Sequence, residues 1–362
     1  MTTSSYIMPA EWDKHEATLL AWPHNKNDWP DRFAPIPWVY ADIIRLLLLH
    51  ERVWLLMRSE KDHKTALEML ERIGADLDKI DFFHVPTDRI WMRDSGPICV
   101  KLVNSDSRMV NGKQDKKTSS LITNHQSPIT FLDFRFNAWA KYPNHKKDDV
   151  IPSILGEALA IPTMQPMHKG KRVVLEGGSI DVNGAGTLLT TEECLLSEIQ
   201  CRNPGFKRED YEQVFAKYLG ITDIVWFEHG IVGDDTHGHV DDLARFVNKD
   251  TIALVVERNK KDDNYALLQA NLKRLKKTKF NIIELPMPKA IMFEGERLPA
   301  SYANFYIANK QVLVPTFNDP NDRLALNLLA EAFPKHEIVG VHCLDFVWGL
   351  GTLHCMSQQI PL

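Results

Sequence analysis

Evenly spaced helices constrain the fold of this chain more than any other feature of its sequence. Amphipathic patterns predict helices with centres near residues 68, 154, 213, 270 and 327, and the last three steps between centres are about 57–59 residues each. Such equal spacing is typical of a repeated supersecondary unit. The first step is longer, and the polar stretch 104–127 accounts for the excess. We interpret that stretch as an inserted surface loop or hairpin.

Each predicted unit combines several strands with one helix. The predicted helices cover residues 62–73, 149–160, 208–219, 263–277 and 321–333, and a further helix at 37–50 is expected ahead of the first unit. Short runs rich in β-branched residues, such as RVVLEGGSIDV (172–182), TIALVV and QVLVPTF, predict the strands. Five such units can be arranged radially around a central channel, as in propellers. The alternative is a plain α/β sheet in which the equal spacing is accidental.

The net charge and the apolar runs of the 362-residue chain limit the kinds of partner that we expect. The formal net charge of −5 and the pI near 6.3 give no basic footprint for nucleic acid. Apolar runs such as Leu46–Leu49 are far too short to cross a membrane. The first residues lack a basic start and a long apolar stretch. We therefore expect no signal peptide, a cytoplasmic location and five reduced cysteines.

The segment TDRIWMRDSGPI (87–98) gathers charged and aromatic side chains before a predicted strand. Asp88, Trp91 and Asp94 suit a cation, because an indole ring offers a cation-binding face and a carboxylate accepts charge-assisted hydrogen bonds. The alternative is structural: Asp94 caps a turn and Arg93 lies on the surface.

Glu176 follows an apolar run in VVLEGGSIDV (173–182) and precedes two glycines. Gly177 and Gly178 permit a close approach of backbone or ligand, although the stretch lacks the spacing of a phosphate-binding loop. A glutamate at the inner end of a buried strand is paired or functional, because an isolated buried charge is costly. The alternative is a glutamate in a turn without a functional role.

The segment GDDTHGHVDDLARF (233–246) suits two chemistries. If residues 236–241 are extended, His237, His239 and Asp241 share one face, since side chains alternate along a strand. That spacing fits the ligands of a zinc-dependent hydrolase. The competing interpretation makes His239 a general base beside Asp241, whose carboxylate binds a guanidinium or ammonium group. A structural histidine cluster is the third reading.

Two His-Cys pairs stand near the end of the sequence, at His342–Cys343 and His354–Cys355. Adjacent residues of an extended segment point to opposite sides, so neither pair suits one metal site, and His354 is predicted to point away from Cys355. Cys343 ends a predicted strand and is expected to be buried. Cys355 stands between a glycine-rich approach and a polar segment, which suits a thiol exposed at a cleft. Its base would come from elsewhere in the chain.

Taken in order, these segments resemble the agmatine deiminase family, which is related to a bacterial type of peptidylarginine deiminase within the guanidino-group-modifying superfamily. The resemblance covers essentially the whole chain. Its motifs are MPAEWDKHEATLLAWP (8–23), W-x-R-D-x-G-P (91–97), LEGGS (175–179), GHVD (238–241), VLVPTF-ND (312–319) and HC-x-S-Q-Q (354–359). The resemblance implies one catalytic domain over residues 1–362 with a five-fold pseudosymmetric α/β propeller of the pentein type.

The resemblance also implies an activity and roles for individual residues. It implies cysteine-dependent hydrolysis of agmatine to N-carbamoylputrescine and ammonia, a step toward putrescine and polyamines. No metal or redox cofactor is implied, the expected partner is a small cationic guanidino substrate, and a homo-oligomer is compatible with the sequence. Cys355 matches the nucleophile, His239 the general acid and base, Asp94 and Asp241 the carboxylates that grip the guanidinium, Glu176 the acid beside substrate and histidine, and Trp91, with Asp88 near it, the substrate-binding segment.

Two positions depart from the family pattern. Members that act on agmatine commonly carry Asn after GHVD, where this chain has Asp242, and a Gly-Gly-Gly-Asn-type approach to the cysteine, where this chain has WGLGTL (348–353). Both positions bear on the tail of the substrate, so peptidylarginine and free arginine are alternative substrates for the same chemistry. A catalytically silent propeller that binds polyamines or a protein partner is a further alternative.

Overall fold

The computed structural model describes residues 6–102 and 129–362, so the insertion predicted at 104–127 lies outside the described residues. Six long helices lie where the amphipathic patterns predict them: α1 (Ile36–Leu47), α2 (Glu60–Arg72), α4 (Ile151–Leu159), α6 (Arg208–Leu219), α7 (Asn264–Leu275) and α8 (Asp322–Ala332). Local signals set their ends. Ser59 caps α2 by accepting a hydrogen bond from the Asp62 backbone N–H, and Gly220, with a φ of 72°, ends α6 in a left-handed conformation.

Five sheets of three or four strands share one pairing pattern, in which an antiparallel pair is followed by a parallel pair. Because parallel strands need a crossover connection, a helix lies between the parallel partners of each sheet. The sheets are β1 (Tyr6–Ile7), β5 (Ile98–Leu102), β6 (Ile129–Leu132) and β7 (Thr163–Met164); β10 (Asp181–Val182), β11 (Thr187–Thr191) and β12 (Asp223–Phe227); β13 (Ala244–Asn248), β14 (Thr251–Val256) and β15 (Asn281–Pro286); β18 (Tyr306–Ala308), β19 (Gln311–Thr316) and β20 (Glu337–His342); and β21 (Gln358–Pro361), β2 (His15–Ala21), β3 (Arg52–Leu56) and β4 (Ile80–Phe83).

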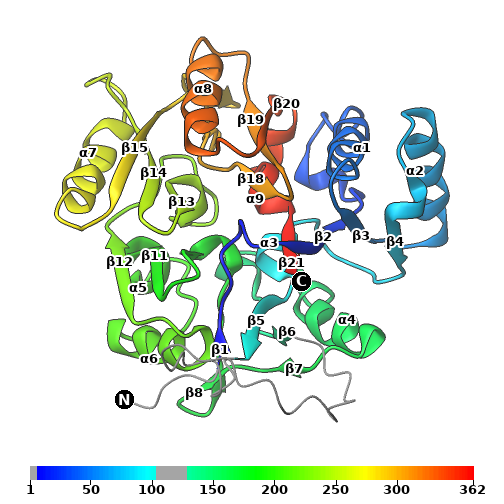
Figure 1. Cartoon of the computed structure of the whole chain (residues 1–362), viewed down its shortest axis with the longest axis horizontal. Coiled ribbons are helices and arrows are strands. Elements are labelled where there is room, and N and C mark those ends of the chain that lie inside the picture. The colour runs from blue at the N-terminus through cyan, green and yellow to red at the C-terminus, as the bar shows by residue number, and fades with distance from the viewer. Residues whose placement is uncertain (1–5, 103–128) are drawn as a thin grey trace, which may run out of the picture.

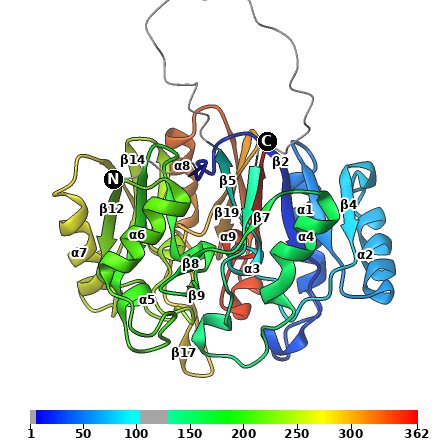
Figure 2. The same cartoon turned by 90° about the horizontal axis from the view of Figure 1, so that it is seen from below.

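The repeat predicted from the helix spacing is present as this sheet-and-helix pattern, and the fold class is α/β. Figure 1 shows the five sheets distributed around the middle of the molecule, with the long helices toward the outside. In the view turned by 90° (Figure 2), helices again flank the molecule and β5, β19 and the short helix α9 (Leu353–Met356) lie between them. No sheet formed by the described residues closes on itself, so the five-fold propeller stays a prediction.

The sheet of β2, β3 and β4 departs from the predicted one-helix unit. Helix α1 is not ahead of the first unit but inside it, where it connects β2 to β3, and α2 connects β3 to β4. Two parallel pairs need two crossovers, which explains the second helix. The fourth strand, β21, pairs antiparallel with β2 and sets Gln359 opposite Thr18. This pairing carries α9 into the middle of the molecule, against the short helix α3 (Met92–Ser95).

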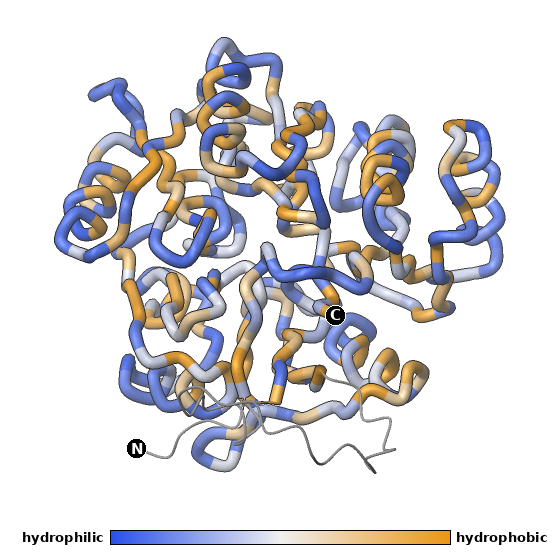
Figure 3. Tube along the Cα trace, viewed as in Figure 1, coloured by the Kyte–Doolittle hydropathy of each residue, from blue (hydrophilic) through white to orange (hydrophobic). Residues whose placement is uncertain are grey.

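Buried apolar side chains anchor both short helices. Met92 of α3 and Leu353 and Met356 of α9 belong to one apolar cluster with residues of α1, β2 and β3. Figure 3 shows the apolar residues in orange along the strands, whereas the helices mix orange and blue. Because such interiors are close-packed, the side chains on α3 and α9 have fixed positions relative to each other. In the two described ranges no helix has the length and apolar character needed to span a bilayer.

Candidate active site

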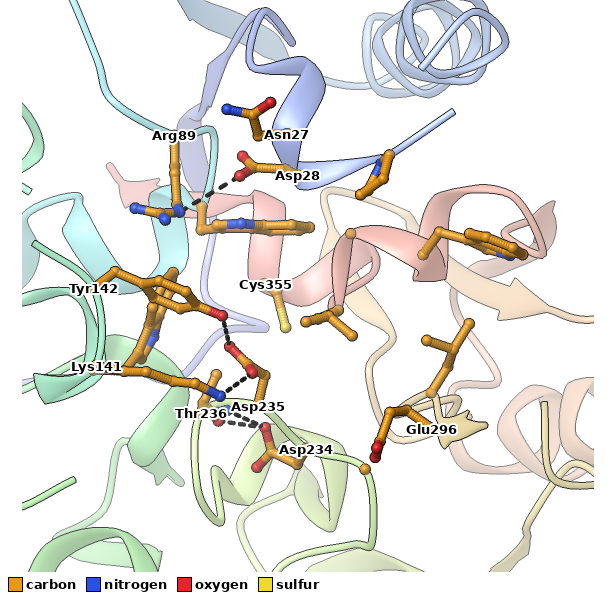
Figure 4. Close-up of a pocket in the computed structure, with 18 of the residues that line it drawn as sticks. Asn27, Asp28, Arg89, Lys141, Tyr142, Asp234, Asp235, Thr236, Glu296 and Cys355 are labelled. Carbon is orange, nitrogen blue, oxygen red and sulfur yellow. Dashed lines mark hydrogen bonds and ion pairs between the residues drawn. The ribbon is translucent and has the colours of Figure 1, made fainter. Parts of the chain in front are cut away.

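A cavity of about 940 Å³ reaches the two short helices, and Trp91, Asp94 and Cys355 form part of its wall. Figure 4 shows the sulfur of Cys355 near the centre of this cavity, between Asp28 on one side and Asp234 on the other. Cys355 is 6% exposed, so the thiol predicted at a cleft faces the cavity from a buried position. Cys343 is fully buried, as predicted.

Asp94 presents its carboxylate to the inner end of the cavity. Its Oδ1 accepts a hydrogen bond from the Gly178 backbone N–H at 3.0 Å, and its Oδ2 accepts one from Trp139 Nε1 at 2.9 Å. Burial raises the pKa of Asp94 to about 6; His239 opposes this shift, and the charges of Asp241 and Glu176 add to it. Both hydrogen bonds fix the direction in which the carboxylate points, so the alternative of a simple turn cap does not describe its contacts.

His239 lies at the centre of three carboxylates. Its Nδ1 is 3.8 Å from Asp94 Oδ1 and 4.0 Å from Asp241 Oδ1, and its Nε2 is 3.9 Å from Glu176 Oε2. Burial by itself lowers the pKa of His239, but the charge of Asp94 and contacts with Cys194 and Glu176 hold it well above its ordinary value. This shift favours the imidazolium form, which can donate a proton.

Four atoms in this cluster are buried without a hydrogen-bond partner: both ring nitrogens of His239, Glu176 Oε2 and Asp241 Oδ1. Buried polar atoms are almost always paired in native structures, and exceptions concentrate at functional sites. The unused acceptors belong to carboxylates, whose preferred partners are cationic N–H donors. The site can thus accept a buried, hydrogen-bonding cation.

A break in the predicted strand 172–182 positions Glu176. The stretch turns at Gly177–Ser179 before β10 begins, and the turn needs a glycine because a Cβ atom at Gly177 would meet the Arg93 carbonyl oxygen at 2.2 Å. Glu176 Oε1 accepts a hydrogen bond from Arg202 Nε at 3.0 Å. Burial would raise the pKa of Glu176, but the charge of Arg202 and the contact with His239 hold it at about 2. Glu176 is therefore an ionised, paired carboxylate, and not a turn residue exposed to solvent.

His354 corrects one prediction from the sequence. Its Nδ1 is 2.7 Å from Asp241 Oδ2 and its Nε2 is 2.8 Å from Glu11 Oε2, so the ring joins the ionic network of the site. Residues 353–356 form a helical turn, not an extended segment, and successive side chains do not point to opposite sides. Asp241 Oδ2 also lies 3.6 Å from Cys355 Sγ. His354 thus orients the carboxylate nearest to the thiol and is not its base.

The shared face of His237, His239 and Asp241, on which the alternative of a zinc site depends, is not formed. His237 has a φ of 64° and residues 240–242 form a 3-10 turn, so the segment is not extended. His237 Nε2 instead lies 3.1 Å from Ser197 Oγ. Two other buried groups in the described residues bring possible ligand atoms within 4.8 Å of one another: Glu176, Cys194 and His239; and Asp241, Asp242 and Cys355.

Asp88 lies apart from the other predicted site residues. Its carboxylate accepts a hydrogen bond from the Lys147 backbone N–H and lies 3.9 Å from Lys147 Nζ, whereas the neighbouring Asp28 and Arg89 line the cavity wall. Sequence reasoning also missed Trp139, Arg202 and Asn304, which hold Asp94, Glu176 and Cys355. None of the three stands in a segment that the motifs single out, so only their contacts in the structure reveal their roles.

Burial raises the pKa of Cys355 well above its ordinary value, and the charges of Asp241, Asp242 and Asp94 add to this effect. The thiol is therefore neutral in the empty site. A bound cation would offset those negative charges and favour the thiolate.

Known proteins with the same fold share this arrangement of the chain. Residues 7–361 match the profile of the Porphyromonas-type peptidyl-arginine deiminase family. A curated relative from Selenomonas ruminantium, which bears a provisional agmatine deiminase name, is 33% identical, with 98% of this chain and 96% of the relative covered.

Two solved structures of agmatine deiminases match this chain over nearly its whole length. C. jejuni agmatine deiminase, solved as a C-to-S variant with substrate bound, is 31% identical with a TM-score of 0.83, and the match covers 98% of this chain and 96% of that one. Agmatine deiminase of Enterococcus faecalis is 28% identical with a TM-score of 0.84, covering 100% and 98%. The chain therefore belongs to the Porphyromonas-type peptidyl-arginine deiminase family.

Proposed function

We propose that this chain hydrolyses agmatine to N-carbamoylputrescine and ammonia through a covalent intermediate on Cys355. Family membership makes the chain a hydrolase of guanidino C–N bonds. One observation carries the proposed roles: the unpartnered buried atoms of Glu176, His239 and Asp241 converge beside Asp94, which lines the cavity together with Cys355. A guanidinium offers five N–H donors and a positive charge, which match these acceptors.

The first half-reaction uses the protonated His239. Asp94 and Asp241 hold the guanidinium on two sides and keep its positive charge near the carbon to be attacked. The Cys355 thiolate forms a C–S bond with that carbon and gives a tetrahedral adduct. His239 donates its proton to the departing nitrogen, the C–N bond breaks and ammonia leaves. An amidino group remains on the sulfur as an S-alkylthiouronium.

The second half-reaction returns the enzyme to its starting state. Neutral His239 takes a proton from a water molecule, and the oxygen attacks the amidino carbon. The C–S bond then breaks and the ureido product leaves with the new C–O bond. Its hydroxyl proton passes to the departing sulfur, so that the neutral thiol and the protonated His239 are restored. Glu176, held ionised by Arg202, stabilises the imidazolium in both halves.

The charges that line the cavity favour agmatine over arginine substrates. Lys141, Arg89 and Arg297 line the wall, but each is paired with an aspartate, so no free cation in the described wall awaits a carboxylate. Acidic residues are more numerous along the wall: Asp28, Asp94, Asp234, Asp235, Glu294 and Glu296. An amine tail fits this surface better than the carboxylate of free arginine.

Ammonia release from agmatine, arginine and an arginine peptide at equal concentrations tests the choice of substrate. We expect agmatine to give the highest kcat/KM, by at least about tenfold, which corresponds to about 1.4 kcal/mol. A preference for the peptide would instead support peptidylarginine deimination, and negligible activity with all three would support the silent binding protein.

The proposal extends to the fold and to the role in the cell. We propose that the five sheets form the five-fold pseudosymmetric propeller implied by the sequence, with the site at its middle. The product makes putrescine and polyamine synthesis the expected pathway, in the cytoplasm and without nucleic acid or membrane as a partner. Ammonia and N-carbamoylputrescine measured in cells with and without the gene test the pathway.

Metal removal separates this chemistry from the zinc-dependent hydrolase. After dialysis against a chelator we expect ammonia release to stay within about twofold of the untreated enzyme, because thiolate, imidazole and carboxylates complete the reaction. Loss of activity that returns with added zinc would contradict the proposal and restore the metal alternative.

The raised pKa of Asp94 predicts that substrate binding weakens at low pH. Because its pKa is about 6, Asp94 loses its negative charge as the pH falls through that value, and its grip on the guanidinium weakens. We expect agmatine affinity to fall up to about tenfold per pH unit below that point. Calorimetric titration of the Cys355→Ala variant isolates this effect from thiol ionisation. An affinity that is constant across this range would refute the role of Asp94.

A further inference from the structure

Asn304 is the amide side chain that contacts the sulfur of Cys355. Its Nδ2 donates hydrogen bonds to Cys355 Sγ at 3.0 Å and to Asp242 Oδ1 at 2.9 Å. Its Oδ1 accepts hydrogen bonds from the Thr352 hydroxyl at 2.7 Å and from the His354 backbone N–H at 3.0 Å. The side chain is fully buried, and both amide hydrogens and both oxygen lone pairs are used.

The backbone fixes the direction in which the Asn304 amide points. The N–H groups of His354 and Cys355 can only donate, so the atom that faces them is the carbonyl oxygen. A flipped amide would set its NH₂ group against these donors and would turn its oxygen toward the sulfur. The amide N–H therefore faces Cys355 whether the sulfur is a thiol or a thiolate.

A hydrogen-bond donor at this position favours the thiolate form of Cys355, which the surrounding carboxyl groups disfavour. Three carboxyl groups oppose negative charge on the sulfur: Asp241, whose Oδ2 is 3.6 Å away, Asp242 and Asp94. In the described part of the chain, the side-chain hydrogen bond donated to Sγ comes from Asn304. A hydrogen bond to a thiolate is charge-assisted and stronger than one to a neutral thiol, so it favours the reactive form.

Asp242 Oδ1 accepts a hydrogen bond from the second amide hydrogen of Asn304. Burial raises the pKa of Asp242 well above its ordinary value, and the charges of Asp241 and Asp234 add to this shift. These effects favour the neutral form of the carboxyl group, whose Oδ1 accepts the amide hydrogen. An asparagine could present an equivalent carbonyl oxygen at this position.

We propose that Asn304 stabilises the Cys355 thiolate through its amide N–H, and that Asp242 is a positioning residue that holds Asn304 in this orientation. The proposal rests on Cys355 as the nucleophile of the proposed function. It assigns to Asn304 a contact with the reacting atom and to Asp242 an effect exerted only through Asn304.

Alkylation of Cys355 by iodoacetamide in the absence of substrate tests the proposal. Mass spectrometry of the peptide that contains Cys355 gives its rate between about pH 6 and pH 10, which reports the thiolate fraction. Asn304→Asp keeps the oxygen that faces the backbone and replaces the donor with an acceptor. We expect this variant to react at least about tenfold more slowly at a given pH, which corresponds to an upward shift of about one pH unit.

Two comparisons control for a merely structural effect. Asn271 is also fully buried and bonded to backbone groups of Glu228 and His229, so Asn271→Asp should leave the alkylation profile of Cys355 unmoved. Asp242→Asn, which keeps an oxygen acceptor for the amide, should not slow the alkylation, whereas Asp242→Ala, which removes the acceptor, should react more slowly than Asp242→Asn.

An unchanged profile in Asn304→Asp, or equal profiles in the two Asp242 variants, would overturn the proposal. If Asn304→Asp fails to fold, the pair of Asp242 variants decides. Alkylation needs no turnover, so this result is independent of the assay for the proposed function. Retained ammonia release by Cys355→Ala would refute the nucleophile, whereas an unshifted alkylation profile would refute only the role of Asn304.

Discussion

Replacement of Cys355 by alanine is expected to abolish ammonia release while agmatine still binds. The thiolate forms the covalent bond in the proposed reaction, and no other cysteine in the described residues lines the cavity. Loss of a nucleophile costs on the order of 10⁴-fold or more in kcat. Asp94, Asp241 and Glu176 stay in place, so the guanidinium keeps its carboxylate partners. Ammonia release measures the first effect and calorimetric titration with agmatine the second.

Cys343→Ala is the matched control for this variant. Cys343 is also a buried cysteine, but it lies at the end of β20 and belongs to the apolar core. Its replacement removes packing alone, which costs about 1 kcal/mol of stability and leaves kcat near that of the parent enzyme. Turnover retained by Cys355→Ala, or lost equally in both variants, would rule out the covalent mechanism.

Gly178→Ala is expected to lower kcat/KM by about 10³-fold or more, because it fills the space at which the cation is held. A Cβ atom at Gly178 would lie 2.5 Å from His239 Nδ1, 2.8 Å from Asp94 Oδ1 and 3.0 Å from Asp241 Oδ2. All three atoms belong to buried groups without room to retreat. One methyl group therefore both occupies the site and displaces its carboxylates.

A second glycine gives the control for this substitution. Gly340 lies on β20, and a Cβ atom there would meet only side-chain atoms of Thr316 and Leu326 at 3.2 Å or more. Gly340→Ala should fold and retain its activity, as measured by thermal unfolding and ammonia release. If Gly178→Ala bound agmatine and turned it over like the parent enzyme, the cation could not be bound between His239, Asp94 and Asp241.

Most of the secondary structure was predictable, because its signals are local. Helix α6 has the predicted bounds, since acidic residues fill its first turn and Gly220 follows its last residue. The stretch 172–182 was predicted as one strand, but it turns at Gly177–Ser179, where Gly177 packs closely against the Arg93 carbonyl. A contact between residues so far apart leaves no trace in the local pattern.

Some residues of the candidate site were likewise predictable from local sequence motifs, and others were not. Asp94, His239 and Cys355 stand in distinctive segments, and the structure brings them to one cluster. Arg202 and Asn304 are single polar residues without a motif, and their roles depend on contacts with Glu176 and Cys355 across the fold. The shared face that the zinc alternative requires is not formed, because alternation of side chains requires an extended backbone, whereas residues 240–242 turn.

The pairing of β21 with β2 has a consequence for how the molecule folds. Thr18 and Gln359 are roughly 340 positions apart, so this contact has one of the largest loop-closure costs in the chain. Until β21 arrives, β2 is an open sheet edge, which is prone to pair with other chains. Helix α9 directly precedes β21 and carries Cys355, so completion of the N-terminal sheet and assembly of the nucleophile are one event. A partly folded chain exposes an edge but has no reactive centre.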